Sequence, residues 1–139
     1  MEIKVLLNQY AQGGFDVIGY DEEIAIAEYI NENQIECPVE LYRGVMVDAD
    51  FEIEVGETLE FENSFASFDE DFEKAKEFAL RRAYGVVFVL ENPVGLPLYE
   101  HADTCWDEQE WLILDGKFEV TEVEKDSDLT VARIRKIPA

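Results

Sequence analysis

Apolar and polar residues alternate along two neighbouring runs, Lys117-Phe118-Glu119-Val120-Thr121-Glu122-Val123 and Leu129-Thr130-Val131-Ala132-Arg133-Ile134. Such alternation is typical of strands that bury one face. Asp126-Ser127-Asp128 lies between the runs and supplies turn-forming side chains. This stretch therefore predicts an antiparallel β-hairpin near the C-terminus.

Further strands are expected upstream of the hairpin. They are Val39–Val47 (interrupted by one glycine), Phe51–Val55, Thr58–Glu62, Gly85–Leu90 and Glu110–Leu114. Phe51–Val55 alternates cleanly and predicts a half-buried strand, whereas the continuous apolar run Gly85–Leu90 predicts a buried central strand.

Two segments place apolar residues at helical spacing, Asp21–Asn33 and about Glu70 to Ala83. Asp21 and Asp69 are positioned to cap the starts of these helices. The chain contains no internal repeat and no Pro/Gly-rich linker. We therefore expect a single α+β domain over residues 1–139, dominated by antiparallel sheet.

The chain is strongly acidic. Its 139 residues include 33 acidic and 11 basic side chains, for a net charge of −22. Such a surface repels phosphate backbones and anionic lipids, so we expect attraction to a basic protein and no direct binding to nucleic acid or membrane.

No transmembrane stretch or signal peptide is recognisable, and Cys37 and Cys105 lack metal-ligand spacing. These features predict a cytoplasmic protein.

Three short segments contain side chains suited to binding and catalysis. Arg43 precedes Gly44 within an expected strand, where a guanidinium could bind a pyrophosphate bidentately or simply form a salt bridge. Asn63–Asp69 leads into the second expected helix and is by itself consistent with a polar loop and a cap. Asp107–Trp111 contains two glutamates two positions apart, which project to one side of an extended chain. In so acidic a chain that pair is also consistent with an ordinary solvated surface.

Taken together and in this order, the three segments resemble the arginine–serine–glutamate class of mono-ADP-ribosyltransferases, which is related to bacterial exotoxins and phage enzymes. The motifs of that family are an aromatic-Arg-Gly strand, a Ser-Thr-Ser-type strand before a helix, and a later Glu-x-Glu. The matching residues are Leu41-Tyr42-Arg43-Gly44, Phe65-Ala66-Ser67-Phe68-Asp69 and Glu108-Gln109-Glu110-Trp111, so only the first serine of Ser-Thr-Ser is kept. The similarity spans roughly Asp21 to Val123. It implies two facing, mostly antiparallel sheets with an NAD-binding cleft and flanking helices.

The resemblance also implies an enzyme that cleaves the nicotinamide–ribose bond of NAD and passes ADP-ribose to a protein without a metal. Glu110 would stabilise positive charge on the ribose, Glu108 would face the acceptor, and Ser67 would position the ribose. Arg43, with Gly44 beside it, would hold the pyrophosphate. The candidates to line the nicotinamide pocket are Tyr42, Phe68, Phe72 and Trp106, although aromatic residues at such positions are more often core.

The acceptor is suggested by the first glutamate of Glu-x-Glu. Relatives that modify arginine have glutamate there, so Glu108 implies an arginine acceptor. The acidic surface would steer a phage- or toxin-type effector to a basic target, such as a nucleic-acid-binding host protein. Two other interpretations stay open: a non-catalytic acidic protein that mimics nucleic acid, and a pseudoenzyme that only binds NAD. Convergence of Arg43, Ser67 and Glu110 on one cleft would favour the enzyme.

Overall fold

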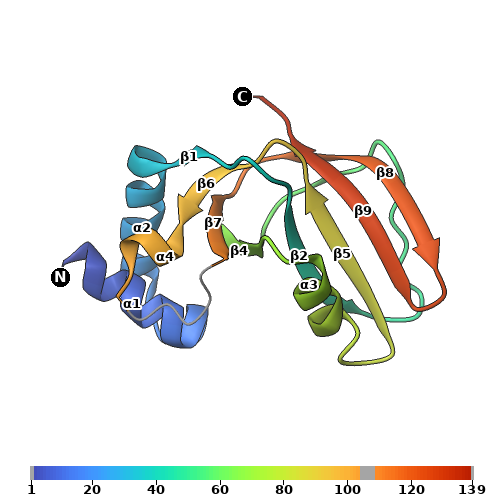
Figure 1. The fold of residues 1–139 in the computed structure, drawn as a ribbon, viewed down its shortest axis with the longest axis horizontal. Coiled ribbons are helices and arrows are strands. Elements are labelled where there is room, and N and C mark those ends of the chain that lie inside the picture. Colours follow the sequence, from blue (N-terminus) through green and yellow to red (C-terminus); the bar gives the residue numbers. More distant parts are fainter. Residues whose placement is uncertain (1, 104–108, 139) are drawn as a thin grey trace.

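The computed structural model describes residues 2–103 and 109–138. The helices are α1 (Ile3–Gly13), the short 3-10 helix η1 (Gly14–Asp16), α2 (Tyr20–Asn33), α3 (Phe72–Ala79) and α4 (Leu98–His101). The strands are β1 (Ile35–Glu36), β2 (Leu41–Val47), β3 (Thr58–Leu59), β4 (Phe65–Asp69), β5 (Tyr84–Leu90), β6 (Val94–Pro97), β7 (Glu110–Leu114), β8 (Phe118–Asp126) and β9 (Leu129–Lys136). Figure 1 shows α1, α2 and α4 grouped at one end of the molecule and the long β8–β9 hairpin at the other.

The strands form one continuous mixed sheet in the order β1-β6-β7-β4-β2-β5-β9-β8-β3. β5 and β9 run parallel, and the other neighbouring pairs of the described strands are antiparallel. The predicted α+β class with a mostly antiparallel sheet is therefore confirmed. The two facing sheets that we expected are two arms of this single sheet, which curls between them (Figure 1).

The arms meet where β2 lies beside β4, a junction that we call the seam. Seven residue pairs join β2 to β5, whereas the single pair Tyr42–Asp69 joins β2 to β4. The first arm is β1-β6-β7-β4 and the second is β2-β5-β9-β8-β3. With so short a ladder between them, the two strands are free to diverge, and the sheet can change direction at the seam.

Three apolar clusters hold the arms and helices together. One contains residues of both arms, including Trp111 and Phe118. The second packs α1 and α2 on the first arm through residues such as Leu7 and Leu112, and the third packs α3 on the second arm through Ala79. The two faces of β7 thus contribute to two different apolar clusters, which explains why its sequence is continuously apolar after the first residue.

Helix α3 begins later than the sequence suggested. Its N-cap is Asp71, whose carboxylate accepts hydrogen bonds from the backbone N–H groups of Glu73 and Lys74 at 3.0 and 3.4 Å. The predicted cap Asp69 is therefore wrong, because β4 continues through that residue. Its carboxylate instead accepts the backbone N–H of Asp71 at 2.7 Å and so orders the approach to the helix.

The packing of α3 on β2 depends on Gly44. A methyl group added there would lie 1.9 Å from the carbonyl oxygen of Ala75, so the helix would have to move. We expect Gly44→Ala to lower the free energy of unfolding by about 2–3 kcal/mol, measured by denaturant titration. Gly116→Ala is the control, since the added methyl would meet the flexible side chain of Lys136. An equal loss in both variants would contradict this assignment.

Several other expectations about local structure are corrected. Helix α1 was not expected, although Leu6, Leu7 and Tyr10 recur at helical spacing and are all buried. Helix α2 begins at Tyr20 with Gly19 as its N-cap, so Asp21 lies in the first turn instead of capping it. No helix within residues 2–103 and 109–138 is long and apolar enough to cross a bilayer.

The predicted strand Phe51–Val55 does not form. Its residues have no strand pairing, and the chain turns at Gly56, which has a φ of +94°. The backbone N–H of Gly56 donates to the carbonyl of Val120, and β3 then takes the place beside β8. Ile53 still packs on the apolar cluster shared by the arms. The alternation therefore reflected the partial burial of Phe51 and Ile53 in a segment that pairs with no strand, and Val55 is exposed.

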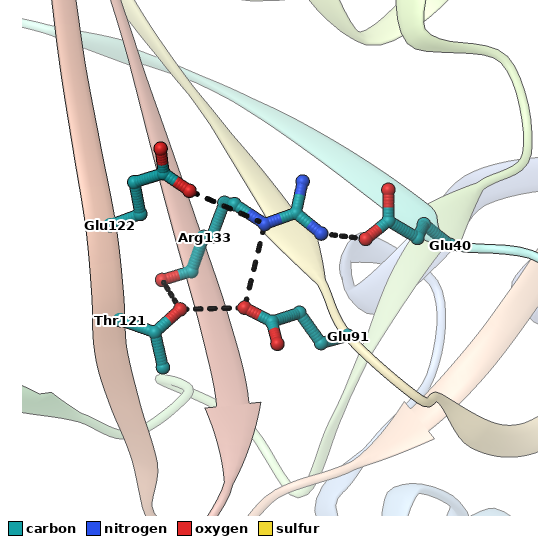
Figure 2. Close-up of polar contacts among 5 residues, drawn as sticks. All are labelled: Glu40, Glu91, Thr121, Glu122 and Arg133. Carbon is teal, nitrogen blue, oxygen red and sulfur yellow. Dashed lines mark hydrogen bonds and ion pairs between the residues drawn. The ribbon is translucent and has the colours of Figure 1, made fainter.

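Arg133 of β9 lies among three carboxylates, as Figure 2 shows. Its guanidinium pairs with Glu40, with Glu91 at 3.5 Å and with Glu122 at 4.0 Å. The hydroxyl of Thr121 donates to the same Glu91 carboxylate at 2.6 Å. Because Glu40 precedes β2 and Glu91 follows β5, this network fastens the ends of those strands to β8 and β9. Arg133 is thus a strand arginine with a structural role.

Candidate active site

Arg43 has different surroundings from Arg133. Its side chain crosses the seam from β2, and its Nη1 donates to the backbone carbonyl of Ser67 at 3.0 Å. Among the described residues it forms no ion pair. Burial lowers the pKa of the guanidinium, while the nearby phenol of Tyr10 acts in the opposite direction. The salt-bridge alternative for Arg43 therefore does not hold within this part of the chain.

The strand register brings Ser67 and Glu110 to one face of the first arm. Ser67 lies opposite Leu112 and Asp69 lies opposite Glu110 in the β4–β7 ladder. Ser67 and Glu110 are thus diagonal neighbours across two strands, a relation in which long side chains can meet. Glu110 is the first residue of β7 and follows Gln109, which lies in a turn.

A cavity of about 280 Å³ unites the three motif residues. Its lining residues are Tyr42, Arg43, Gly44, Ser67, Phe68, Asp69, Lys74, Ala75, Phe78 and Glu110. They include two cationic side chains and two carboxylates, which gives the cavity both anion-binding and cation-stabilising groups. Side chains from β2, β4, β7 and α3 therefore converge here, although they are far apart in sequence.

Some expected site residues have a mainly structural environment. Phe72 packs edge-on against Tyr42, with ring centroids 5.5 Å apart, in the cluster beneath α3, and it does not line the cavity. Phe68 is 2% exposed and belongs to the cluster shared by the arms. Gly44 borders the cavity, but its missing side chain accommodates α3. Glu108 and Trp106 lie outside the described residues.

Asp69 occupies the last position of the altered Ser-Thr-Ser motif. Besides accepting the N–H of Asp71, its carboxylate lies 3.6 Å from the ammonium of Lys74. It thereby fixes the start of α3 beside the cavity. The carboxylate of Asp69 also holds the ammonium of Lys74, in the first turn of α3, at the cavity that Arg43 lines.

No protein-family model matches this chain, and no curated protein matches it in sequence. Among solved structures, the ADP-ribosyltransferase Vis in complex with agmatine is similar over 100% of this chain and 70% of its own, with a TM-score of 0.69 and 19% identity. Vis is a toxin from Vibrio splendidus. The ADP-ribosyltransferase toxin Plx2a from Paenibacillus larvae is similar over 98% of this chain and 86% of its own, with a TM-score of 0.68 and 11% identity.

The chain has the ADP-ribosyltransferase fold.

Within this ADP-ribosyltransferase fold, two residues that no sequence motif indicated also lie at the site. Lys74 lines the cavity from α3. Tyr10 reaches the site from α1, and its phenol oxygen lies 2.7 Å from the hydroxyl oxygen of Ser67. The helical spacing of α1 could have indicated that Tyr10 is buried, but 57 residues separate it from Ser67 and no motif links the two.

A second cavity of about 330 Å³ in the ADP-ribosyltransferase fold also borders Arg43. Its lining residues are Phe15, Arg43, Val45, Leu59, Glu60, Phe61, Glu62, Asn63, Phe65, Ala66, Phe68, Phe88 and Ile134. This space is largely aromatic and apolar, with polar groups contributed by the segment before β4. A planar ring could bind there, with Arg43 between it and the first cavity.

Proposed function

We propose that this protein is an NAD-dependent mono-ADP-ribosyltransferase that transfers ADP-ribose from NAD to an arginine of a protein target. The observation that carries the proposal is the single cavity lined by Arg43, Ser67 and Glu110. Arg43 lies on β2, Ser67 on β4 and Glu110 at the start of β7. This convergence is the feature that separates the enzyme from a purely acidic mimic, which would need no such cleft.

The chemistry assigns a separate task to each of these side chains. Cleavage of the nicotinamide–ribose bond leaves positive charge on the ribose, as in glycoside hydrolysis, and the carboxylate of Glu110 would stabilise that charge. Ser67 would hold the ribose through its hydroxyl. Arg43 would bind the pyrophosphate, since a guanidinium forms paired hydrogen bonds with phosphate oxygens.

The site is suited to NAD despite the negative charge of the whole protein. Long-range repulsion is screened beyond about 8 Å at physiological salt, so local cations decide the interaction with the pyrophosphate. Arg43 and Lys74 both line the main cavity. The second cavity, which is lined mainly by aromatic and apolar residues and borders Arg43, could hold a ring at one end of the ligand. The pyrophosphate of the same ligand would then contact the guanidinium of Arg43. No metal is needed for these steps.

The proposed acceptor is a guanidinium group. Glu108 would bind it and accept its proton at attack. Vis binds agmatine, which carries a guanidinium group, and this favours the same acceptor class here. With 33 acidic residues against 11 basic ones, the protein would be drawn to a basic target such as a nucleic-acid-binding host protein. We thus propose a phage- or toxin-type effector that acts in a host cytoplasm.

Incubation of the purified protein with labelled NAD and a host lysate tests the function. We expect labelled protein bands, and mass spectrometry should place ADP-ribose on arginine. NAD binding without release of nicotinamide would support the pseudoenzyme instead. Tight, salt-sensitive capture of a basic protein with no NAD binding would support the nucleic-acid mimic. ADP-ribose found on asparagine, serine or a nucleobase would overturn the proposed acceptor.

Glu108→Gln tests how the acceptor is recognised. We expect loss of transfer to protein together with continued slow hydrolysis of NAD, because a neutral amide cannot take the proton of a guanidinium, whereas water needs no such carboxylate. Both reactions can be followed in parallel as labelled protein and as free nicotinamide. Glu100→Gln, at an exposed glutamate of α4, is the control. Wild-type transfer by Glu108→Gln would show that Glu108 belongs only to the acidic surface.

A further inference from the structure

Tyr10 places a phenol hydroxyl within a mainly apolar layer of the protein. The residue is 6% exposed and belongs to the cluster between the N-terminal helices and the first arm. Its ring meets those of Phe15 and Phe65 edge-on, with centroids 5.2 and 5.1 Å away. Packing alone would be satisfied by a phenylalanine. The hydroxyl therefore needs its own explanation, because a buried phenol is stabilised only when it is hydrogen-bonded.

The hydroxyl of Ser67 is the hydrogen-bond partner of that phenol. Within the described residues, Tyr10 Oη has no hydrogen-bond partner other than Ser67 Oγ, at 2.7 Å. Either hydroxyl can be the donor at this distance, and the direction that satisfies the buried phenol proton has Tyr10 donating and Ser67 accepting. The proton of Ser67 is then left for a different acceptor.

The electrostatic surroundings keep the phenol of Tyr10 protonated and therefore able to donate. Burial raises the pKa of its phenol to about 12, and the nearby Glu110 carboxylate also acts to raise it, against the effects of Ser67 and Arg43. The phenol is thus protonated throughout the physiological pH range. Tyr10 is thus hydrogen-bonded to Ser67 and interacts electrostatically with Glu110 and Arg43.

We propose that Tyr10 is a positioning residue that holds the Ser67 hydroxyl as a hydrogen-bond acceptor and so directs the Ser67 proton into the cavity. There the proton can be donated to a ribose hydroxyl of the ligand or to the Glu110 carboxylate. This role rests on the proposed transferase function. It assigns to α1, which lies outside the sequence motifs, a direct influence on the orientation of the reacting sugar.

Tyr10→Phe removes the phenol oxygen and keeps the ring. We expect kcat for NAD cleavage to fall roughly 10- to 100-fold, since a misdirected donor weakens positioning in the transition state, while KM for NAD changes less than about threefold. Tyr29→Phe is the matched control. Tyr29 also has a phenol hydrogen-bonded in the helical layer, at 2.8 Å from His101 Nδ1, and this variant should keep wild-type kcat.

A double-mutant cycle separates positioning from stability. If Tyr10 acts through Ser67, then Tyr10→Phe should lower kcat in the wild-type background and have almost no effect in Ser67→Ala. Equal fractional losses in both backgrounds would overturn the proposal, as would wild-type kcat in Tyr10→Phe or a loss that merely follows the unfolded fraction at the assay temperature. Wild-type protein that does not cleave NAD would overturn the transferase function and this role with it. Active wild-type protein with unaffected Tyr10→Phe would overturn the role of Tyr10 alone.

Discussion

Glu110→Gln is expected to lower kcat for ADP-ribose transfer and NAD hydrolysis by about 10²–10³-fold. The neutral amide keeps the shape of the side chain and some hydrogen-bonding capacity, so the ground-state complex with NAD should be little altered. The variant loses the negative charge that, in the proposed mechanism, stabilises the positive charge developing on the ribose. The loss should therefore appear in kcat, with KM for NAD within a few-fold of wild type.

Steady-state release of nicotinamide measures both parameters for this variant. Glu119→Gln is a suitable control, since it makes the same chemical change on β8 of the other arm, where Glu119 pairs with the exposed Arg135 at 3.0 Å. Equal kcat for wild type and Glu110→Gln would exclude the assigned role. A large rise in KM with unchanged kcat would instead make Glu110 a substrate-binding residue.

Arg43→Ala is expected to act mainly on substrate binding, raising KM for NAD by about 10- to 100-fold. This corresponds to the roughly 1.5–3 kcal/mol that a hydrogen bond to a charged group contributes. In the proposed mechanism the guanidinium binds the pyrophosphate, which is not altered during the reaction, so kcat should fall less than kcat/KM. Because Arg43 also binds the backbone carbonyl of Ser67 across the seam, a moderate loss of stability is expected as well.

Two further variants make the interpretation of Arg43 specific. Arg135→Ala removes an exposed strand arginine that lies in an ion pair with Glu119, and should leave KM unchanged. Arg43→Lys keeps the charge but not the paired donors, so it should recover only part of the affinity. A wild-type KM in Arg43→Ala at a temperature where the variant is folded would show that the arginine serves only the seam.

The elements predicted correctly are those with a strong local pattern. The β8–β9 hairpin alternates on both strands, β5 is continuously apolar, and α2 has helical spacing over its length. These signals depend on residues close together in the chain. The order of the strands in the sheet depends instead on residues far apart in the chain. The parallel pairing of β5 with β9, for example, is not indicated by any local feature.

The site was predicted only as a set of separate segments. Three motifs in order indicated Arg43, Ser67 and Glu110, yet each had an ordinary explanation by itself, and only the register of β2, β4 and β7 places them at one cavity. Gly44 was expected to admit a pyrophosphate because a glycine beside an arginine suggests close approach. The close approach is real, but its partner is the backbone of α3. Tyr10 was not predicted as a site residue because its contact with Ser67 depends on how α1 packs on the first arm.

The single residue pair at the seam has a consequence for cooperativity of unfolding. Ser67 and Glu110 belong to one arm and Arg43 to the other, so a dinucleotide that contacts all three acts as a non-covalent cross-link. Partial opening that separates the arms without melting either one would be suppressed in proportion to ligand occupancy. Amide protons on both sides of the seam should then slow their hydrogen exchange together when NAD is added. The shortest strand ladder of the sheet, between β2 and β4, would thus be held together by the proposed substrate.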